Sequence, residues 1–391
     1  MISPRGGSVL GAGIALVISW FALGEIELLA AGAALIVAVL LAVAVAIWNR
    51  PILEIHRQLN PTLVHEGDRT SVELSIVNLR RLPAFGLIVS DGVGDLGTAR
   101  FSLGSLPGNE PALASYRIVC RPRGVYDVGP ASVRVSDPLG LATVESSIGE
   151  VDELIVYPAT ESLSAYPFVR GRDPSQTASR PEQSHRGGED FFTLRAYSDG
   201  DDLRRVHWPS SAKLDELMIR QMENPWQSRA LIFLDIRRRS HPDRDVFEKA
   251  VRGAASVVKH LAGGGFAADL WLGSGLIDVG AYTAAMESLA RVQMVEAVDI
   301  KSVAGRLRQT GRGGALVMVT GAADEDLLAV HRLLSAQHRV TVLLAASPEP
   351  NPYLVTFQKE GVKTVTTGPG EGWAPAWNQT MERTWLSASV G

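Results

Sequence analysis

The chain is poor in cysteine: Cys120 is the only one among 391 residues. A single thiol excludes an internal disulfide and any metal cluster built from several cysteines. Cys120 lies in a segment that we expect to be rich in β-strands, where a small buried thiol is far more common than a nucleophile. We therefore expect Cys120 to be part of a hydrophobic core.

Neither sign of charge is in large excess. The 38 lysines and arginines nearly balance the 42 aspartates and glutamates, which gives a net charge of -4. A slightly acidic chain gives no reason to expect nucleic acid as a partner. Hydrophobic residues make up 46% of the sequence and charged residues 20%. This is the composition of a folded protein, and the length allows two or three domains.

Common catalytic motifs are absent from the sequence as well. It contains no G-x-x-x-x-G-K-[ST] phosphate loop, no H-E-x-x-H and no G-x-S-x-G. Gly11 and Gly13 lie inside an apolar run and not behind a strand, so they form no dinucleotide-binding fingerprint. We predict no catalytic residue, no metal and no cofactor, and we expect the protein not to be an enzyme.

Two long uncharged runs lie near the N-terminus, at residues 8–24 and 28–48. A helix needs about 20 apolar residues to cross a bilayer. The runs therefore predict a hairpin of two transmembrane helices within residues 1–50, with Trp20 and Trp48 near the membrane interfaces. A cleavable signal peptide and a pair of buried core helices are the alternatives. Against them, a second span follows at once and neither run has a polar face.

Charged residues at the ends of these runs predict their orientation. The only charged residues between the two runs are Glu25 and Glu27. The basic residues that flank them on the outer sides are Arg5, Arg50, His56 and Arg57. The positive-inside rule then places both termini in the cytoplasm and the acidic turn outside. We expect a multi-pass protein of the inner (plasma) membrane, with the lipid bilayer as one partner.

Residues 55–158 have the pattern of an all-β sandwich similar to an immunoglobulin domain. Turn sequences separate short segments rich in alternating apolar residues. These segments are Thr70–Val77, Phe85–Val89, Ala114–Val119, Ser132–Val135 and Leu154–Tyr157.

Residues 226–368 alternate between predicted strands and helices. The strands are Ala230–Asp235, Ala267–Leu272, Ala315–Thr320, Val340–Ala345 and Val362–Thr366. The helices are Asp245–Leu261, Ala284–Val292, Lys301–Gln309 and Glu325–Ala336. Repeated β–α–β units predict a doubly wound α/β domain with a mostly parallel sheet. The tail, residues 369–391, carries Trp373, Trp377 and Trp385 and is a candidate docking helix.

Asp235 ends the first strand of this α/β domain, where such sheets bind ligands. A carboxylate followed by hydroxyls two and four residues later would hold Mg²⁺. Here Arg237 and Arg239 occupy those two positions, and their positive charge opposes a cation. We treat Asp235 as a degenerate metal-site position and expect it to pair with one of the arginines.

The connecting segment, residues 161–225, contains an unusual mixture between Gly187 and Arg220, where large aromatic residues alternate with charges. Solvated connectors lack such aromatics. We expect a docked segment in which Phe192 and Trp208 are buried and arginines bind carboxylates. A plain connector and a catalytic site using Glu189, Asp201 or His207 are the alternatives, although the catalytic spacing is missing.

Residues of several dispersed blocks in this segment form a recognisable pattern: Gly188, Glu189, Phe191, Leu194, Arg195, Tyr197, Gly200, Asp201, Arg204, Trp208, Ser211, Ala212, Lys213 and Arg220. This pattern resembles the signature of the bacterial membrane protein family called domain of unknown function 58. The order of two spans, a β-rich domain, the signature and an α/β domain is also similar to that family. The resemblance implies that the last domain is similar to von Willebrand factor type A domains. Metal-binding domains of that type carry D-x-S-x-S after the first strand, from which this chain departs at Arg237 and Arg239.

The resemblance also implies partners, since members are commonly encoded beside MoxR-type AAA ATPases and other membrane proteins. Our leading hypothesis is a membrane-anchored, non-enzymatic scaffold or accessory protein that binds protein partners in envelope or complex-assembly processes. The signature residues would form the interaction site. The rival hypothesis is an envelope-related hydrolase that uses Glu189, Asp201 or Asp235. A third is a sandwich that binds carbohydrate or peptide, for which the sequence shows no aromatic platform.

Overall fold

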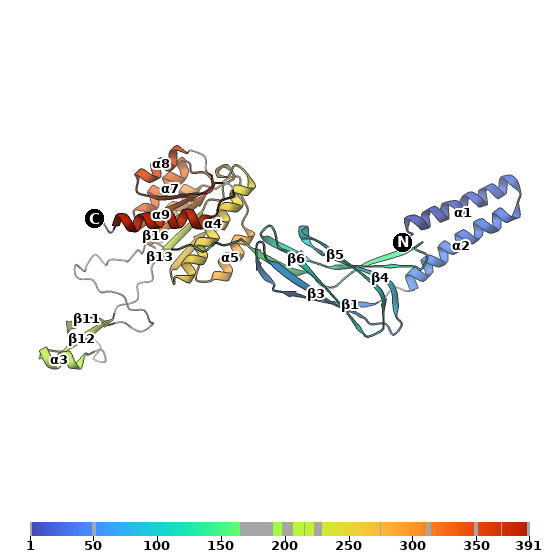
Figure 1. Ribbon diagram of the computed structural model, residues 1–391, viewed down its shortest axis with the longest axis horizontal. Helices are drawn as coiled ribbons and strands as arrows, with labels where there is room; N and C mark the ends of the chain where they lie inside the picture. The colour runs from blue at the N-terminus through green and yellow to red at the C-terminus, as the bar shows by residue number, and fades with distance from the viewer. Residues whose placement is uncertain are drawn as a thin grey trace. The chain divides into compact units, whose positions relative to one another are not determined.

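The computed structural model shows two compact units, which we describe separately (Figure 1). The first comprises Met1–Ala159 with Leu289–Arg291, and the second comprises Thr160–Ser288 and Val292–Gly391. The structure describes residues 2–48, 52–164, 191–197, 206–214, 216–222, 229–273, 275–309, 314–347, 351–368 and 370–388.

The chain begins with the two apolar helices, α1 (Pro4–Leu23) and α2 (Ile26–Trp48). The first starts four residues before the predicted span. Ser3 caps it by accepting a hydrogen bond from Gly6 N, and Pro4 supplies a helical φ at the first position. Gly24 ends the helix in the left-handed conformation with φ of 72°. Both helices are long and apolar enough to cross a membrane.

The two helices pack closely where Gly13 faces Gly32. A Cβ atom added to Gly32 would lie 2.7 Å from the carbonyl O of Gly13. Glycine therefore lets the backbones approach, which is the usual way in which helices associate in lipid. Most of the other apolar side chains remain exposed: only 11% of the apolar window of α1 and 17% of that of α2 is buried. Core helices of a soluble protein would be mostly buried. The alternative of two buried core helices therefore does not fit α1 and α2.

The β-rich body of the first unit follows from Leu53. One sheet has the order β1-β3-β6, and the other has the order β2-β10-β7-β4-β8-β9 with β5 paired to β4. The strands are β1 (Leu53–Asn60), β2 (Leu63–His65), β3 (Arg69–Asn78), β4 (Ala84–Val93), β5 (Gly97–Leu106), β6 (Pro111–Val119), β7 (Gly124–Val128), β8 (Ala131–Ser136), β9 (Thr143–Ile148) and β10 (Asp152–Tyr157). A short 3-10 turn, Gly94–Leu96, joins β4 to β5. The five predicted strands are present, whereas β1, β2, β5, β7 and β9 were not predicted.

Alternating side chains of these strands form the core. Leu74, Ile76, Leu87 and Val133 are fully buried in one cluster. Cys120 is buried in a second cluster, as expected, and burial raises the pKa of its thiol.

Arg57 lies inside this β-rich body and not at its surface. Its side chain donates to Asp91 Oδ1 at 2.6 Å and to Asp152 Oδ2 at 2.7 Å. Tyr116 Oη donates to the other oxygen of Asp91 at 2.6 Å. The sequence-based count of basic residues beside the second span included Arg57. In the folded protein its charge is paired with these two carboxylates, and the orientation drawn from that count stays a prediction.

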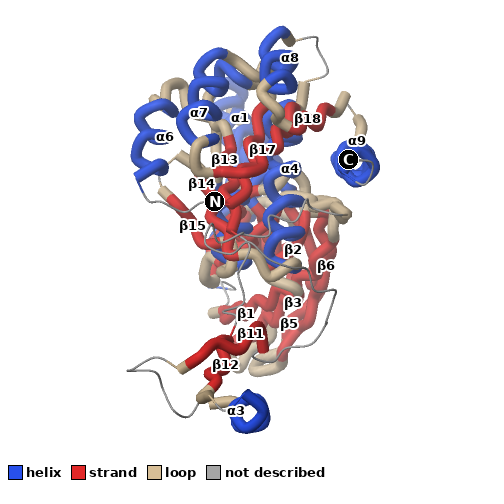
Figure 2. The backbone as a smooth tube through the Cα atoms, turned by 90° about the vertical axis from the view of Figure 1, so that its left-hand side faces the viewer, coloured by secondary structure: helices blue, strands red, loops and turns tan. Residues whose placement is uncertain are grey.

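The second unit is built on one six-stranded sheet with the order β15-β14-β13-β16-β17-β18 (Figure 2). Its strands are β13 (Arg229–Leu234), β14 (Ala267–Trp271), β15 (Leu276–Asp278), β16 (Gly314–Thr320), β17 (His338–Ala345) and β18 (Lys363–Thr366). Every neighbouring pair is parallel except β14 with β15. The five predicted strands and their order of appearance are confirmed, and the short β15 is an addition.

Helices cover both faces of this sheet. They are α4 (Arg244–Gly263), α5 (Tyr282–Arg291), α6 (Ile300–Gln309), α7 (Glu325–Ser335), α8 (Pro352–Lys359) and α9 (Trp373–Ala388). On β13, Leu231 and Phe233 pack with α6 and α7, and the alternate residues Ile232 and Leu234 are also buried. Strands buried on both faces explain the continuous apolar runs in the sequence.

The C-terminal helix α9 is part of the second unit. Trp373 and Trp377 are fully buried, and Trp373 Nε1 donates to Lys249 O on α4 at 2.9 Å. Glu161 accepts from the backbone N of Trp373 at 2.9 Å and of Ala374 at 2.8 Å, which caps the first turn of α9. Residue 161, which we had placed in the connecting segment, thus packs with the α/β domain.

We predict that Gly32→Leu destabilises the helical hairpin, because the added side chain would overlap the backbone of α1. Overpacking of this kind costs about 1–3 kcal/mol. The readout is the temperature at which the detergent-solubilised full chain loses its monodisperse peak in size-exclusion chromatography. Gly11→Leu is the matched control, since a Cβ there meets nothing within 4 Å. Equal behaviour of the two variants would show that the close crossing does not matter.

Candidate functional site

The order of the parallel strands points to one place on the second unit. Counted along the chain, its parallel strands run 2-1-3-4-5 across the sheet, so the direction of winding reverses between β13 and β16. Ligands of doubly wound domains bind beyond the carboxyl ends of the strands at such a reversal. Asp235 follows β13 directly, Thr320 is the last residue of β16, and Asp324 caps the next helix, α7. These side chains therefore lie where a doubly wound domain would hold a ligand.

The guanidinium group of Arg237 fills the reversal point. Its Nε and Nη2 donate to Oδ1 and Oδ2 of Asp235 at 2.9 and 2.7 Å. Its Nη1 and Nη2 donate to Oδ2 and Oδ1 of Asp324 at 3.0 and 3.1 Å. Both carboxylates are held in two-point contact, which is the strongest geometry open to arginine. The Arg237 side chain is almost completely buried. Its bonds to Asp235 and Asp324 join the loop after β13 to the loop after β16.

More exposed charges surround this buried pair. Asp326 lies 2.5 Å from Lys301 Nζ and also pairs with Arg239. Arg239 Nη2 lies 3.4 Å from Asp324. Thr320 Oγ1 donates to Asp235 Oδ2 at 3.2 Å. The sequence analysis did not identify Asp326 or Lys301. The only sequence signal for Asp326 is that it is a second acid beside Asp324, the cap of α7.

The pKa values of the buried pair favour its charged form. Burial alone would raise the pKa of Asp235, but the hydrogen bonds and charge of Arg237 outweigh it and hold that pKa below its usual value. Burial alone would lower the pKa of Arg237, yet its hydrogen bonds and attraction to Asp235 and then Asp324 raise it. Asp235 is therefore a bound carboxylate and is poorly suited to act as a general acid or base.

These residues do not fit a divalent cation. The space between Asp235 and Asp324 is taken by a side chain that carries its own positive charge. Among the described residues no group of three or more His, Cys, Asp or Glu side chains is arranged to hold a metal. The expected pairing of Asp235 with one of the arginines is present, and the partner is Arg237.

The signature segment forms a small substructure of its own. Strand β11 (Phe191–Ala196) pairs antiparallel with β12 (Met218–Met222), and helix α3 (Trp208–Leu214) lies between them in sequence. The pairing sets Leu194 opposite Arg220 and Arg195 opposite Ile219. Tyr197 N donates to Leu217 O at 2.7 Å. The structure thus brings together the two ends of the signature.

Ser211 has a clear structural role in this substructure. Its hydroxyl donates to His207 O at 3.0 Å and accepts from Met218 N at 2.8 Å, so it ties α3 to β12. Ala212 and Lys213 are exposed on α3. Gly188, Glu189, Gly200, Asp201 and Arg204 lie outside the described residues.

The prediction that Trp208 is buried is wrong: its side chain is 68% exposed. Trp208 is the first residue of α3, and this helix has only seven residues, so it cannot cover its own large aromatic side chain. Phe192 lies in β11, but its side chain is not among those described.

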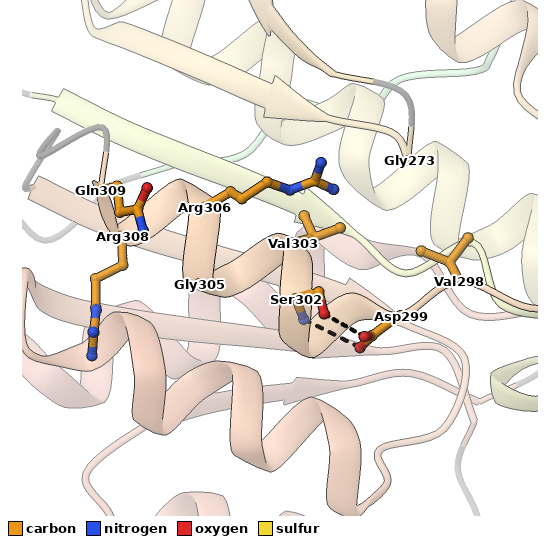
Figure 3. A pocket seen from close by; sticks show the side chains of 9 residues that line it. All are labelled: Gly273, Val298, Asp299, Ser302, Val303, Gly305, Arg306, Arg308 and Gln309. Carbon is orange, nitrogen blue, oxygen red and sulfur yellow. Dashed lines mark hydrogen bonds between the residues drawn. The ribbon is translucent and has the colours of Figure 1, made fainter.

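A shallow hollow of about 720 Å³ lies beside α6 (Figure 3). Its lining includes Asp299, Ser302, Arg306 and Arg308. Asp299 accepts from the backbone N of Lys301 and of Ser302 at 3.1 and 3.2 Å, so its carboxylate serves as the cap of α6. No sequence argument had pointed to this hollow.

Comparison with known proteins adds little about chemistry. No family model matches the chain. It is 26% identical over 329 residues to the uncharacterized protein YeaD of Bacillus subtilis, a match that covers 78% of this chain and 79% of that one. Among solved structures, the CARDB domain of a Pyrococcus furiosus protein is matched at 14% identity and a TM-score of 0.21, over 27% of this chain and 93% of that one. The alkylpurine DNA glycosylase AlkC of Pseudomonas fluorescens is matched at 14% identity and a TM-score of 0.20, over 36% of this chain and 42% of that one. Structural likenesses this low carry no argument.

We predict that Arg237→Ala strongly destabilises the second unit, because it leaves the buried Asp235 carboxylate without its partner. Breaking a buried pair in this way costs about 3–5 kcal/mol, or roughly 10 °C in the melting midpoint of a domain of this size. The measurement is thermal unfolding of the full chain in detergent, followed by tryptophan fluorescence. Arg238→Ala is the control, since that side chain is 63% exposed. A midpoint equal to that of the control would contradict the structural role of Arg237.

We also predict that the second unit loses stability as the pH falls below about 6.5, the value for histidine in an unfolded chain. Burial lowers the pKa of His241, His260, His331 and His338, so the folded state resists their protonation. The unfolded state then binds more protons than the folded state, and stability falls with the pH. Melting midpoints between pH 8 and pH 5 test this.

His241→Asn provides the control for that titration. His241 Nδ1 lies 3.0 Å from Arg237 O, and an asparagine amide can donate the same hydrogen bond without titrating. The variant should lose part of the pH dependence and keep its stability near pH 8. An unchanged pH profile in this variant would exclude His241 as a contributor.

Proposed function

We propose that this protein is a membrane-anchored, non-enzymatic scaffold of the family called domain of unknown function 58, with a C-terminal domain of the von Willebrand factor type A kind. Helices α1 and α2 span the inner membrane, and both termini lie in the cytoplasm. The β-rich body corresponds to an immunoglobulin-like sandwich. Its partners are proteins, including a MoxR-type AAA ATPase and other membrane proteins.

The exposed Trp208 is the observation that carries the protein-binding role. An indole ring in water exposes a large apolar area, and tryptophan is enriched among the residues that dominate the energy of protein interfaces. Trp208 lies on a short helix that Ser211 fixes to β12, so the ring is presented from an ordered support. Lys213 is exposed on the same helix and supplies polar character at the rim.

The geometry of Asp235 disfavours the rival hydrolase. Both of its oxygens accept hydrogen bonds from Arg237, and its pKa is lowered. A catalytic carboxylate needs an open oxygen and a pKa near the working pH. The two other acids of that hypothesis, Glu189 and Asp201, lie outside the described residues.

We expect affinity purification of the full chain from detergent extracts to enrich a MoxR-type AAA ATPase. The variant Trp208→Ala should reduce the recovery of this ATPase at least about tenfold. A tenfold loss corresponds to about 1.4 kcal/mol of binding free energy, which is typical of an interface anchor. Leu113→Ala is the control, since Leu113 is also a highly exposed apolar residue and lies on β6. Full recovery with Trp208→Ala would exclude this anchor. Failure to enrich any ATPase with the unmodified chain would exclude the partner.

Topology is tested separately with reporter fusions at Gly24 and after Gly391. A reporter that is active only outside the cell should work at Gly24 and fail after Gly391, because the turn between α1 and α2 is expected outside. The reverse pattern would place the β-rich body and the α/β domain outside the cytoplasm.

A further inference from the structure

One end of the β-rich body lies against the ends of the two apolar helices. Ser3 N donates to Leu141 O at 2.9 Å, and Ser3 Oγ donates to Gly140 O at 2.6 Å. Gly6 approaches so closely that a side chain there would collide with Leu141 O. The start of α1 is therefore fixed to the loop 137–142, which follows β8.

The end of α2 is fixed to a second loop of the same body. Arg80 Nη1 donates to Trp48 O at 2.8 Å, which satisfies one of the carbonyl groups that a helix end leaves without a partner. The loop 79–83 is itself held by the buried Asn78, whose Nδ2 donates to Leu82 O at 2.9 Å. Both loops thus lie at the level where the apolar helices end.

Large apolar side chains on these loops are nevertheless exposed. The exposed fraction is 67% for Leu82, 68% for Leu139 and 77% for Trp48 at the end of α2. Arg5 and Arg81 are exposed at the same end. The acid within these loops is Asp137, which is buried and accepts from Leu139 N at 2.8 Å and Ala142 N at 2.6 Å. At the same end, Glu110 in the turn before β6 and Glu54 near the start of β1 are exposed.

We propose that this end of the β-rich body, formed by the loops 79–83 and 137–142, rests in the headgroup layer of an anionic lipid leaflet. Leu82 and Leu139 enter the interface beside Trp48, and Arg5, Arg80 and Arg81 lie among the lipid phosphates. The proposal rests on the membrane anchoring by α1 and α2 stated above and deepens it by naming the lipid chemistry.

Lipid is the occupant that the structure favours because the surface is continuous with the apolar helices. Exposed leucines interleaved with arginines are the composition of segments that lie on a bilayer, and tryptophan is enriched at the same depth. The basic residues Arg5, Arg80 and Arg81 outnumber the exposed acids Glu54 and Glu110 at this end, and anionic lipid attracts basic side chains near its surface. A protein bound at this end is the competing outcome, and the experiment below separates the two.

The test uses a fluorescent probe on single cysteines in the full chain, with Cys120→Ser as the background because Cys120 is buried. Probes replace Leu82 or Leu139, and the chain is reconstituted into nanodiscs of phosphatidylcholine with phosphatidylglycerol, some carrying spin-labelled lipid. We expect the spin label to quench both probes and their emission to shift to the blue.

Two control positions make the result interpretable. Val119 is an exposed apolar residue at the other end of the β3–β6 pair, opposite Arg69 and about 30 Å from Asn78 along β3, and a probe there should not be quenched. Leu40 on α2 reports the anchoring itself and should be quenched strongly. Quenching at Leu40 without quenching at Leu82 and Leu139 overturns this inference and leaves the anchoring intact. Without quenching at Leu40, both fail.

Charge reversal tests the lipid headgroup. Arg81→Glu should lower the ratio of lipid-contacting to water-exposed probe at position 82 about fivefold or more. The reason is that each basic residue near an anionic surface adds to the free energy of lipid binding. Arg69→Glu, at the far end of β3, should leave it unchanged. Quenching that is equal in discs of pure phosphatidylcholine, and unaffected by Arg81→Glu, would overturn the role of anionic lipid. A blue shift without lipid quenching would indicate a protein contact instead.

Discussion

The second unit depends on one buried guanidinium group. The loops after β13 and β16 each bring an aspartate, Asp235 and Asp324, to the reversal point of the sheet. Without a cation between them these two carboxylates would repel each other. Arg237 supplies the cation from the chain itself. Domains that recruit a metal at such a position gain a ligand-dependent switch, whereas a covalently attached cation holds the two loops together at all times. Asp326 pairs with Arg239 and Lys301 at the surface beside this buried group.

The sequence predicted the regular parts of this architecture well, because they follow from local periodicity. Apolar runs in the sequence predicted the five parallel strands of the α/β sheet. Arginines two and four residues after Asp235 predicted that this carboxylate pairs with an arginine, which is Arg237. Short edge strands such as β15 escaped notice because three residues carry too little periodicity. The contact of Lys301 with Asp326 joins two helices across 25 residues, and no local pattern in the sequence reveals such a contact.

The membrane-proximal charges show where counting along the chain fails. Arg57 is nine residues beyond Trp48, the last residue of α2, yet its side chain is buried within the β-rich body and pairs with Asp91 and Asp152. Arg80 is far along the chain, but β1 and β3 form an antiparallel pair that returns the chain to the helix end. The folded distance of an arginine from the helix end therefore cannot be counted along the chain.

Arg57 and Arg237 represent the same physical solution in the two units. Each is a nearly buried arginine held by two aspartates on different segments, and each pair links strands that are far apart in the sequence. Buried ion pairs add little net stability compared with apolar packing, but removing one partner is costly, so they fix one arrangement of the loops. The scaffold role that we propose would need such fixed loops more than an open pocket. In that proposal, the exposed Trp208 on α3 would meet a partner, and the leucines and arginines beside α1 and α2 would meet the lipid.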